Sequence, residues 1–172
     1  MSKITNRGFP PVIVGRPKVI ILGSMPGEES LRKKQYYANP RNLFWEIMGG
    51  FFHFNKDDEY KIKIKALTDN GVALWDVIDK CERKGSLDSA IKPESIVVND
   101  FASLFSDNKS IRYVFFNGTK AEKEYQKRVL PTLNNIAEDI KHHLLPSTSP
   151  ANAAKSKADK IKEWSKINTM LI

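Results

Sequence analysis

Four short segments that are predicted to be strands, three of them mostly apolar and each followed by small or polar residues, constrain the fold of this chain most strongly. These runs cover residues 19–22, 72–75, 112–116 and 141–145, and helical patterns separate them. Strands that alternate with helices predict a parallel sheet with right-handed helical crossovers. We therefore expect an α/β fold, a three-layer α/β/α sandwich with a central four-stranded parallel sheet. The loops that follow the strands should then emerge at one edge of that sheet.

The segments around these runs carry weaker signals. Helices are predicted over residues 43–52, 57–69, 120–129 and 155–168, with short helices between 86 and 108. Pro131 is expected to end the helix over 120–129. Residues 76–86 are expected to form a loop, and residues 1–17 an irregular arm. A chain of 172 residues can bury a full core, so residues 1–172 are predicted to form a single domain.

Composition excludes several classes of protein. No apolar run of 18 residues and no apolar leader is present, so neither membrane insertion nor secretion is expected. The single cysteine, Cys81, excludes an internal disulfide and a Cys-ligated cluster or Cys-rich zinc site within one chain, and it suits a reducing cytoplasm.

The distribution of charge suggests a polyanionic partner. The net charge is +8, and the excess of Lys and Arg lies in residues 1–50, with eight against three acids, and 141–172, with six against two. A basic surface of this kind attracts nucleic acid. The alternative is that lysine serves only solubility.

The segment after the first run has the layout of a ligand pocket. Gly23–Gly27 contains two glycines and a proline, and small residues let main-chain N–H groups approach a ligand closely. A basic segment with Tyr36 and Tyr37 follows, and Asn42 precedes an apolar helix. This layout suits a flat, polar ring attached to a phosphate backbone, although Asn42 could be only a helix cap.

The other strand ends also carry polar residues. Asp76 follows the second run, Asn117 the third, and Ser147-Thr148-Ser149 lie between two prolines after the fourth. Ligands of α/β folds bind at the carboxyl ends of the strands. Asp76 could instead be a cap or a buried partner of Arg83. The serine-rich segment suits DNA phosphates, and it could also form a turn that caps the last helix.

Five motifs together carry a family resemblance. They are Leu22-Gly23-Ser24-Met25-Pro26-Gly27, residues 36–45 (YYANPRNLFW), residues 74–86 with Leu74-Trp75-Asp76 and Cys81-Glu82-Arg83, residues 116–121 (FNGTKA), and residues 145–152 (LPSTSPAN). In this order they resemble the uracil-DNA glycosylase superfamily, in particular its hypoxanthine-DNA (deoxyinosine) glycosylase branch. The resemblance spans roughly residues 18–154.

The resemblance implies a monofunctional DNA glycosylase that hydrolyses the bond between a deaminated base and deoxyribose, without a cofactor or metal. It implies Asn42 as the catalytic residue, an important role for Asn117, and a DNA-clamping role for the serine-rich loop. An acid in the first loop and a histidine in the last, usual in uracil enzymes, are replaced here by Ser24/Met25 and Pro146/Ser147. His142 and His143, upstream on the strand, are expected to be structural.

The predicted site follows from these motifs. The catalytic candidates are Asn42 and Asn117, and the base-binding candidates are Gly23, Ser24, Met25, Tyr37, Phe44 and Asp76. The DNA-binding candidates are Arg41, Ser147, Thr148, Ser149, Asn152 and Lys155. Phe44 or Tyr37 would stack on a flipped base.

The predicted substrate is single- or double-stranded DNA that contains a deaminated base, acted on by a cytoplasmic monomer. An ionised Asp76 could accept a hydrogen bond from hypoxanthine N1–H or uracil N3–H, whereas adenine N1 has no hydrogen to donate. Hypoxanthine is the first choice of base and uracil the second. Two alternatives stay open: a glycosylase of this fold specific for uracil or mismatched thymine, and a non-catalytic nucleic-acid-binding module.

Overall fold

The computed structural model describes residues 4–172, so residues 1–3 of the predicted arm lie outside the described part. Its central sheet has the strand order β3-β2-β6-β7, and every neighbouring pair is parallel. The strands are β2 (Val19–Gly23), β3 (Val72–Asp76), β6 (Tyr113–Asn117) and β7 (Lys141–Leu145). The predicted α/β class and four-stranded parallel sheet are confirmed.

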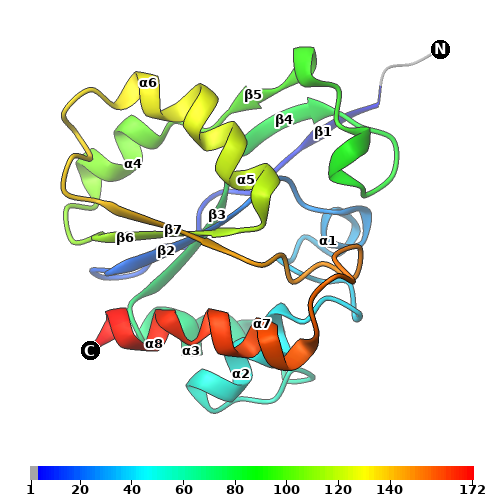
Figure 1. Cartoon of the computed structure of the whole chain (residues 1–172), viewed down its shortest axis with the longest axis vertical. Coiled ribbons are helices and arrows are strands. Elements are labelled where there is room, and N and C mark those ends of the chain that lie inside the picture. Colours follow the sequence, from blue (N-terminus) through cyan, green and yellow to red (C-terminus); the bar gives the residue numbers. More distant parts are fainter. Residues whose placement is uncertain (1–3) are drawn as a thin grey trace.

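Helices cover both faces of this sheet (Figure 1). One face carries α2 (Phe44–Phe52), α3 (Tyr60–Asp69), α7 (Lys157–Trp164) and α8 (Lys166–Leu171); the other carries α4 (Phe101–Asp107), α5 (Thr119–Glu124) and α6 (Leu130–Leu133). Successive side chains of a strand point to opposite faces. Accordingly, Ile20 and Leu22 of β2 pack in one apolar core and Val19 and Ile21 in the other.

A second, antiparallel sheet corrects two expectations. It has the order β1-β4-β5 and consists of β1 (Thr5–Arg7), β4 (Ile78–Glu82) and β5 (Val97–Val98). The expected loop over 76–86 is therefore mostly strand, and the N-terminal arm is not wholly irregular. The reason is a third apolar cluster, which β4 builds with Ile78 and Cys81 against Met25.

The helical segments differ from expectation at three places. A helix, α1 (Glu28–Lys33), lies within the basic segment. Pro131 does not end a helix: a π-helical turn, η3 (Tyr125–Val129), follows α5, and Pro131 lies in the first turn of α6, where no main-chain N–H donor is needed. The predicted helix over 155–168 is divided at Ser165 into α7 and α8. The short helices between 86 and 108 include two 3₁₀ turns, η1 (Asp88–Ala90) and η2 (Pro93–Ser95).

The N-terminal arm lies along the outer edge of β3. The main chains of Val12 and Leu74 exchange two hydrogen bonds, of 2.8 and 3.0 Å. The indole N–H of Trp75 donates to the Phe9 carbonyl at 3.0 Å. Within residues 4–172, no helix is both long and apolar enough to cross a membrane.

Candidate active site

The carboxyl ends of β2 and β3 bring three predicted site residues together. Gly23 and Asp76 are register partners at the ends of these strands. A Cβ atom on Gly23 would lie 2.5 Å from Asp76 Oδ1 and 3.2 Å from the Tyr37 hydroxyl oxygen. A side chain at position 23 would therefore collide with the carboxylate, so glycine is required here by close approach. The predicted convergence of polar residues at this edge is present.

Asp76 is an acid held in the interior. Its side chain is 4% exposed, and Oδ2 has no hydrogen-bond partner among residues 4–172. Burial raises the pKa of Asp76 to about 7, the negative charge of Asp88 adds to this rise, and the positive charge of Arg83 opposes it. A buried carboxylate oxygen without a partner is costly, which is the expected condition of a group that receives a hydrogen bond from a ligand.

Tyr37 lies over this acid in an unusual backbone conformation. Its φ is +54°, a left-handed value that is rare for a bulky residue and concentrates at functional sites. The Tyr37 hydroxyl is buried and makes no hydrogen bond of good geometry within residues 4–172, but the Asn117 carboxamide lies close enough to lower the pKa of the phenol. Burial, and next the charge of Asp76, raise the pKa of this phenol well above its usual range.

The two aromatic candidates for base stacking have different positions. The rings of Tyr37 and Phe44 stack on each other, with centroids 3.9 Å apart and planes at 23°. Phe44 is 0% exposed, so the expectation that it could stack on a base is wrong for this conformation. Tyr37 is partly exposed and lines a cavity of about 260 Å³. Of the two rings, Tyr37 is the one that presents a face to a ligand, and Phe44 supports it from below.

Asn42 lines the same cavity as Tyr37. Its Oδ1 accepts a hydrogen bond from the Phe44 main-chain N–H at 2.9 Å, and its own N–H donates to the Asn39 carbonyl at 2.9 Å. Asn42 therefore does bind the start of the helix, as the alternative predicted, and this contact uses one lone pair of its Oδ1. The same contact fixes the carboxamide at the rim of the cavity, with its NH₂ group and second lone pair still available. Asn42 lies one residue before the N-cap, Leu43, and its contact with the helix start is compatible with a functional role.

Asn117 is held at the end of β6 by one residue of the serine-rich loop. Its Nδ2 donates to Thr148 Oγ1 at 2.9 Å, and its Oδ1 accepts from the Thr148 main-chain N–H at 2.9 Å. Thr148 is 0% exposed, so the expectation that its side chain binds DNA is wrong. Its hydroxyl is directed inward because it completes this pair of bonds.

The flanking residues of that loop stay nearer the surface. The Ser147 hydroxyl oxygen accepts from the Ser149 N–H, and the Ser149 hydroxyl oxygen accepts from the Ala151 N–H, both at 3.2 Å. Asn152 Nδ2 donates to the Ser147 carbonyl at 3.1 Å. The expected turn is therefore formed, but it does not cap the last helix, because the N-cap of α7 is Ser156. Each serine hydroxyl still has a hydrogen that can be donated to a phosphate oxygen.

Ser24 and Met25 correct another expectation. The Ser24 hydroxyl donates to Asp88 Oδ1 at 2.7 Å, and the Met25 side chain packs in the third apolar cluster with Ile78 and Cys81. The Met25 side chain is therefore buried in the core, and the Ser24 hydroxyl is occupied by its hydrogen bond to Asp88. A role in base binding is left to the main-chain groups of this loop.

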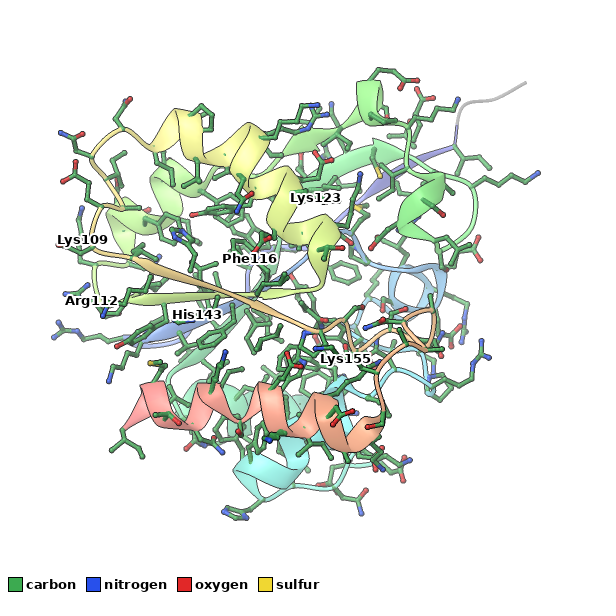
Figure 2. The ribbon with its side chains drawn as sticks, in the orientation of Figure 1. Lys109, Arg112, Phe116, Lys123, His143 and Lys155 are labelled. Atoms are coloured by element: carbon green, nitrogen blue, oxygen red, sulfur yellow. The ribbon has the colours of Figure 1, made fainter. Side chains whose placement is uncertain are left out.

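The two basic candidates for DNA contact are exposed. Arg41 lies on the surface beside Asn42. Lys155 forms an ion pair with Glu163 of α7. Figure 2 shows Lys155 near the carboxyl ends of the central strands, whereas Lys109 and Arg112 lie at the opposite end of the sheet. Basic residues thus occur at both ends, and Lys155 belongs to the end that carries the site.

The comparisons with known proteins decide the family. The chain matches the family model of the uracil DNA glycosylase superfamily over residues 10–171. The chain belongs to this superfamily. It is 42% identical over 160 residues to a hypoxanthine DNA glycosylase of Methanosarcina acetivorans, an overlap of 92% of this chain and 95% of that protein. It is 37% identical over 156 residues to a hypoxanthine DNA glycosylase of Methanosarcina barkeri, covering 90% and 93% of the two chains.

A solved structure gives the same result. The solution NMR structure of a uracil DNA glycosylase candidate from Methanosarcina acetivorans matches with a TM-score of 0.80 at 38% identity, covering 98% of this chain and 99% of that one. The protein is thus a DNA N-glycosylase, an enzyme of base excision that acts on DNA.

The two strand histidines of this glycosylase lie away from the site residues. His142 Nε2 is 3.2 Å from the Tyr125 hydroxyl, and the His143 ring stacks on Phe115 with centroids 4.9 Å apart. Burial lowers the pKa of both imidazoles. They pack against the sheet, as expected, and Asn42 rather than a histidine faces the cavity.

Two charged residues of the glycosylase site were not selected as functional from the sequence. Arg83 is 2% exposed; one nitrogen, Nη2, donates to the Pro26 carbonyl, whereas Nε and Nη1 have no partner within residues 4–172. Asp88 bonds Ser24 and acts on Asp76 by its charge. Arg83 was considered only as a partner of Asp76, and nothing in the local sequence distinguishes Asp88 from a helix-start acid. In the described part of the chain, no three His, Cys, Asp or Glu residues form a group that could hold a metal ion.

Proposed function

We propose that this glycosylase excises hypoxanthine from deoxyinosine in DNA, with uracil as a second substrate. The observation that carries the proposal is the buried Asp76 Oδ2, which has no hydrogen-bond partner within residues 4–172 and lies where β2 and β3 end, with the buried Tyr37 hydroxyl beside it. The names of the two Methanosarcina relatives support the choice of hypoxanthine.

Recognition of the base follows from the chemistry of Asp76. An ionised carboxylate accepts hydrogen bonds and cannot donate them. It accepts the N1–H of hypoxanthine or the N3–H of uracil, whereas the N1 of adenine has no hydrogen and would place a lone pair against a negative charge. A pocket that leaves a buried polar group unpaired rejects the wrong ligand strongly. The exposed face of Tyr37 supplies a stacking surface for the extruded ring.

Cleavage of the glycosidic bond makes two demands. The sugar develops positive charge and the departing base negative charge. Asn42 cannot deprotonate water, but its free lone pair on Oδ1 can orient a water molecule toward the sugar carbon and face the positive charge. The second N–H of Asn117, which lies on the side of the Tyr37 hydroxyl, and main-chain N–H groups of residues 23–27 can donate to the departing base. Donors of this kind contribute about 10²–10³ in rate each.

The loop around Ser147 and Ser149, together with Arg41 and Lys155, is proposed to hold the DNA backbone while the base is out of the helix. Base flipping costs a few kcal/mol, which phosphate contacts offset. A site completed by one chain supports a monomer, and a single buried, free cysteine supports a cytoplasmic place of action. Sedimentation at several protein concentrations tests the monomer.

The deciding experiment is release of free base from duplex oligonucleotides that each contain one deoxyinosine, deoxyuridine, deoxyxanthosine or deoxyadenosine. We expect fastest release from deoxyinosine, slower release from deoxyuridine and none from deoxyadenosine. Asp76→Asn should reduce the preference for deoxyinosine over deoxyadenosine. Faster release of uracil or mismatched thymine than of hypoxanthine would overturn the substrate choice. Binding of every oligonucleotide without release of any base would indicate the non-catalytic alternative.

A further inference from the structure

Thr148 is fully buried although it lies in the middle of the loop proposed to contact DNA. Serines flank it on both sides, and both keep part of their surface exposed. A threonine at the centre of such a loop is expected to be turned outward, toward phosphate. Its inward position therefore indicates a task inside the protein.

That task is visible in its contacts with Asn117. One bond runs from Asn117 Nδ2 to the threonine hydroxyl and the other from the threonine N–H to Asn117 Oδ1, both at 2.9 Å. The Thr148 N–H can only donate, so an amide turned over would place its NH₂ group against this N–H and lose that bond, and the hydroxyl holds the other end of the carboxamide in place. The second hydrogen of Nδ2 then has a fixed direction, on the side of the Tyr37 hydroxyl, whose pKa the Asn117 amide lowers.

Further contacts anchor the loop that contains Thr148. The Thr148 carbonyl accepts a hydrogen bond from the Leu43 N–H at 3.1 Å, next to Asn42. From α7, the Trp164 indole donates to the Pro146 carbonyl at 2.9 Å and Lys160 Nζ to the Asn152 carbonyl at 2.7 Å. A Cβ atom on Gly118, whose φ is +96°, would lie 3.0 Å from Ser147 Cβ, so the end of β6 touches this loop directly.

We propose that Thr148 is a positioning residue: its hydroxyl fixes the Asn117 carboxamide so that the second N–H is held beside the Tyr37 hydroxyl, where a departing base can receive it. Since the same loop presents Ser147 and Ser149 to the DNA backbone, the grip on DNA and the orientation of Asn117 depend on one rigid segment. This inference rests on the role of Asn117 in the proposed function. A misplacement of about 1 Å can reduce a rate about a hundredfold, so a single lost bond is measurable.

The test compares Thr148→Val, which keeps the shape and removes the hydroxyl, with Thr148→Ser, which keeps the hydroxyl. Thr132→Val is the control for the same chemical change elsewhere, because its hydroxyl donates to a main-chain carbonyl, that of Val129, and lies in α6. We expect Thr148→Val to lower the single-turnover rate on deoxyinosine duplex at least about tenfold, with the Kd for DNA changed less than about twofold. Thr148→Ser and Thr132→Val should keep nearly the full rate.

A double-mutant cycle identifies the route. If Thr148 acts through Asn117, Thr148→Val should add little loss to Asn117→Ala. Fully additive losses, an unchanged rate in Thr148→Val, or a loss that appears only in DNA binding would each overturn the inference.

A measurement that does not depend on catalysis separates this inference from the proposed function. In ¹⁵N-labelled protein, the side-chain NH₂ signals of Asn117 should be sharp and protected from exchange in the wild type and in Thr148→Ser, and averaged in Thr148→Val. Unchanged signals in Thr148→Val would contradict the positioning role even if no base were released from any substrate. Release of hypoxanthine by the wild type with unchanged signals in Thr148→Val would leave the proposed function intact and remove this inference alone.

Discussion

Replacement of Asp76 by asparagine should make the protein more stable and less selective. The carboxyl is buried, and its pKa is raised from 3.8 to about 7 in the folded state. Between these two values the folded state keeps a proton that the unfolded chain has lost. Stability therefore falls as the pH rises from 4 to 7, and it levels off above the folded pKa. The carboxamide of the variant would carry no such dependence, because it is neutral throughout.

The size of the effect follows from the two pKa values. If the full difference between them is used, the raised pKa lowers the free energy of unfolding by about 2 kcal/mol at pH 5 and about 4 kcal/mol at pH 8. The difference of about 2 kcal/mol is the firmer quantity, because the buried carboxamide of the variant has its own need for partners. For a chain of this length, 1 kcal/mol shifts the Tm by about 2–4 °C. The Tm advantage of Asp76→Asn should thus grow by about 4–8 °C between pH 5 and pH 8.

Thermal unfolding followed by circular dichroism at both pH values measures this shift. Asp107→Asn, which changes an exposed acid at the end of α4, is the control and should show no comparable trend. A Tm difference that stays constant or shrinks with rising pH would refute the reasoning, because Asp76 would then be ionised at little cost in the folded state.

Three further predictions concern catalysis and binding. Asn42→Ala should keep the fold and lower single-turnover cleavage of deoxyinosine DNA at least about a hundredfold, and near-normal cleavage would remove Asn42 from the mechanism. Affinity for duplex DNA should fall steeply from low to moderate salt, as measured by fluorescence anisotropy, whereas a flat salt profile would argue against the phosphate contacts. Cleavage of deoxyinosine should rise as Asp76 ionises near pH 7. Arg83→Met removes a charge that lowers this pKa, so the rising limb of the pH–rate profile should move to higher pH; an unmoved limb would assign it to another group.

The strands β2 and β3 of the central sheet could be predicted because they are continuous apolar runs that are buried on both faces. The strand β4 could not. A register irregularity between Ile78 and Lys80 shifts the alternation of buried and exposed residues, so both Ile78 and Cys81 point into the core. With two charged residues between them, this segment has neither the period of a strand nor the composition of a buried one.

In the site, too, some positions could be predicted from the sequence and others could not. The positions of Asp76 and Asn117 followed from topology, since both end parallel strands at one edge. The inward turn of Thr148 did not, because it depends on an asparagine 31 residues away in the sequence. The burial of Phe44 beneath Tyr37 likewise depends on a left-handed residue that no local pattern indicated. Contacts between distant segments, rather than local propensity, decided which candidates face the cavity.

The arm that runs beside β3 also protects the protein from aggregation. β3 is an outer strand of the central sheet, and an uncovered outer strand offers its main chain to any other chain for intermolecular pairing. The N-terminal arm covers this outer edge of β3, because Val12 pairs with the Leu74 main chain and the Trp75 indole donates to the Phe9 carbonyl. A shortened chain that begins after residue 17 would expose it, and the first symptom of the loss would be aggregation rather than a defect in chemistry.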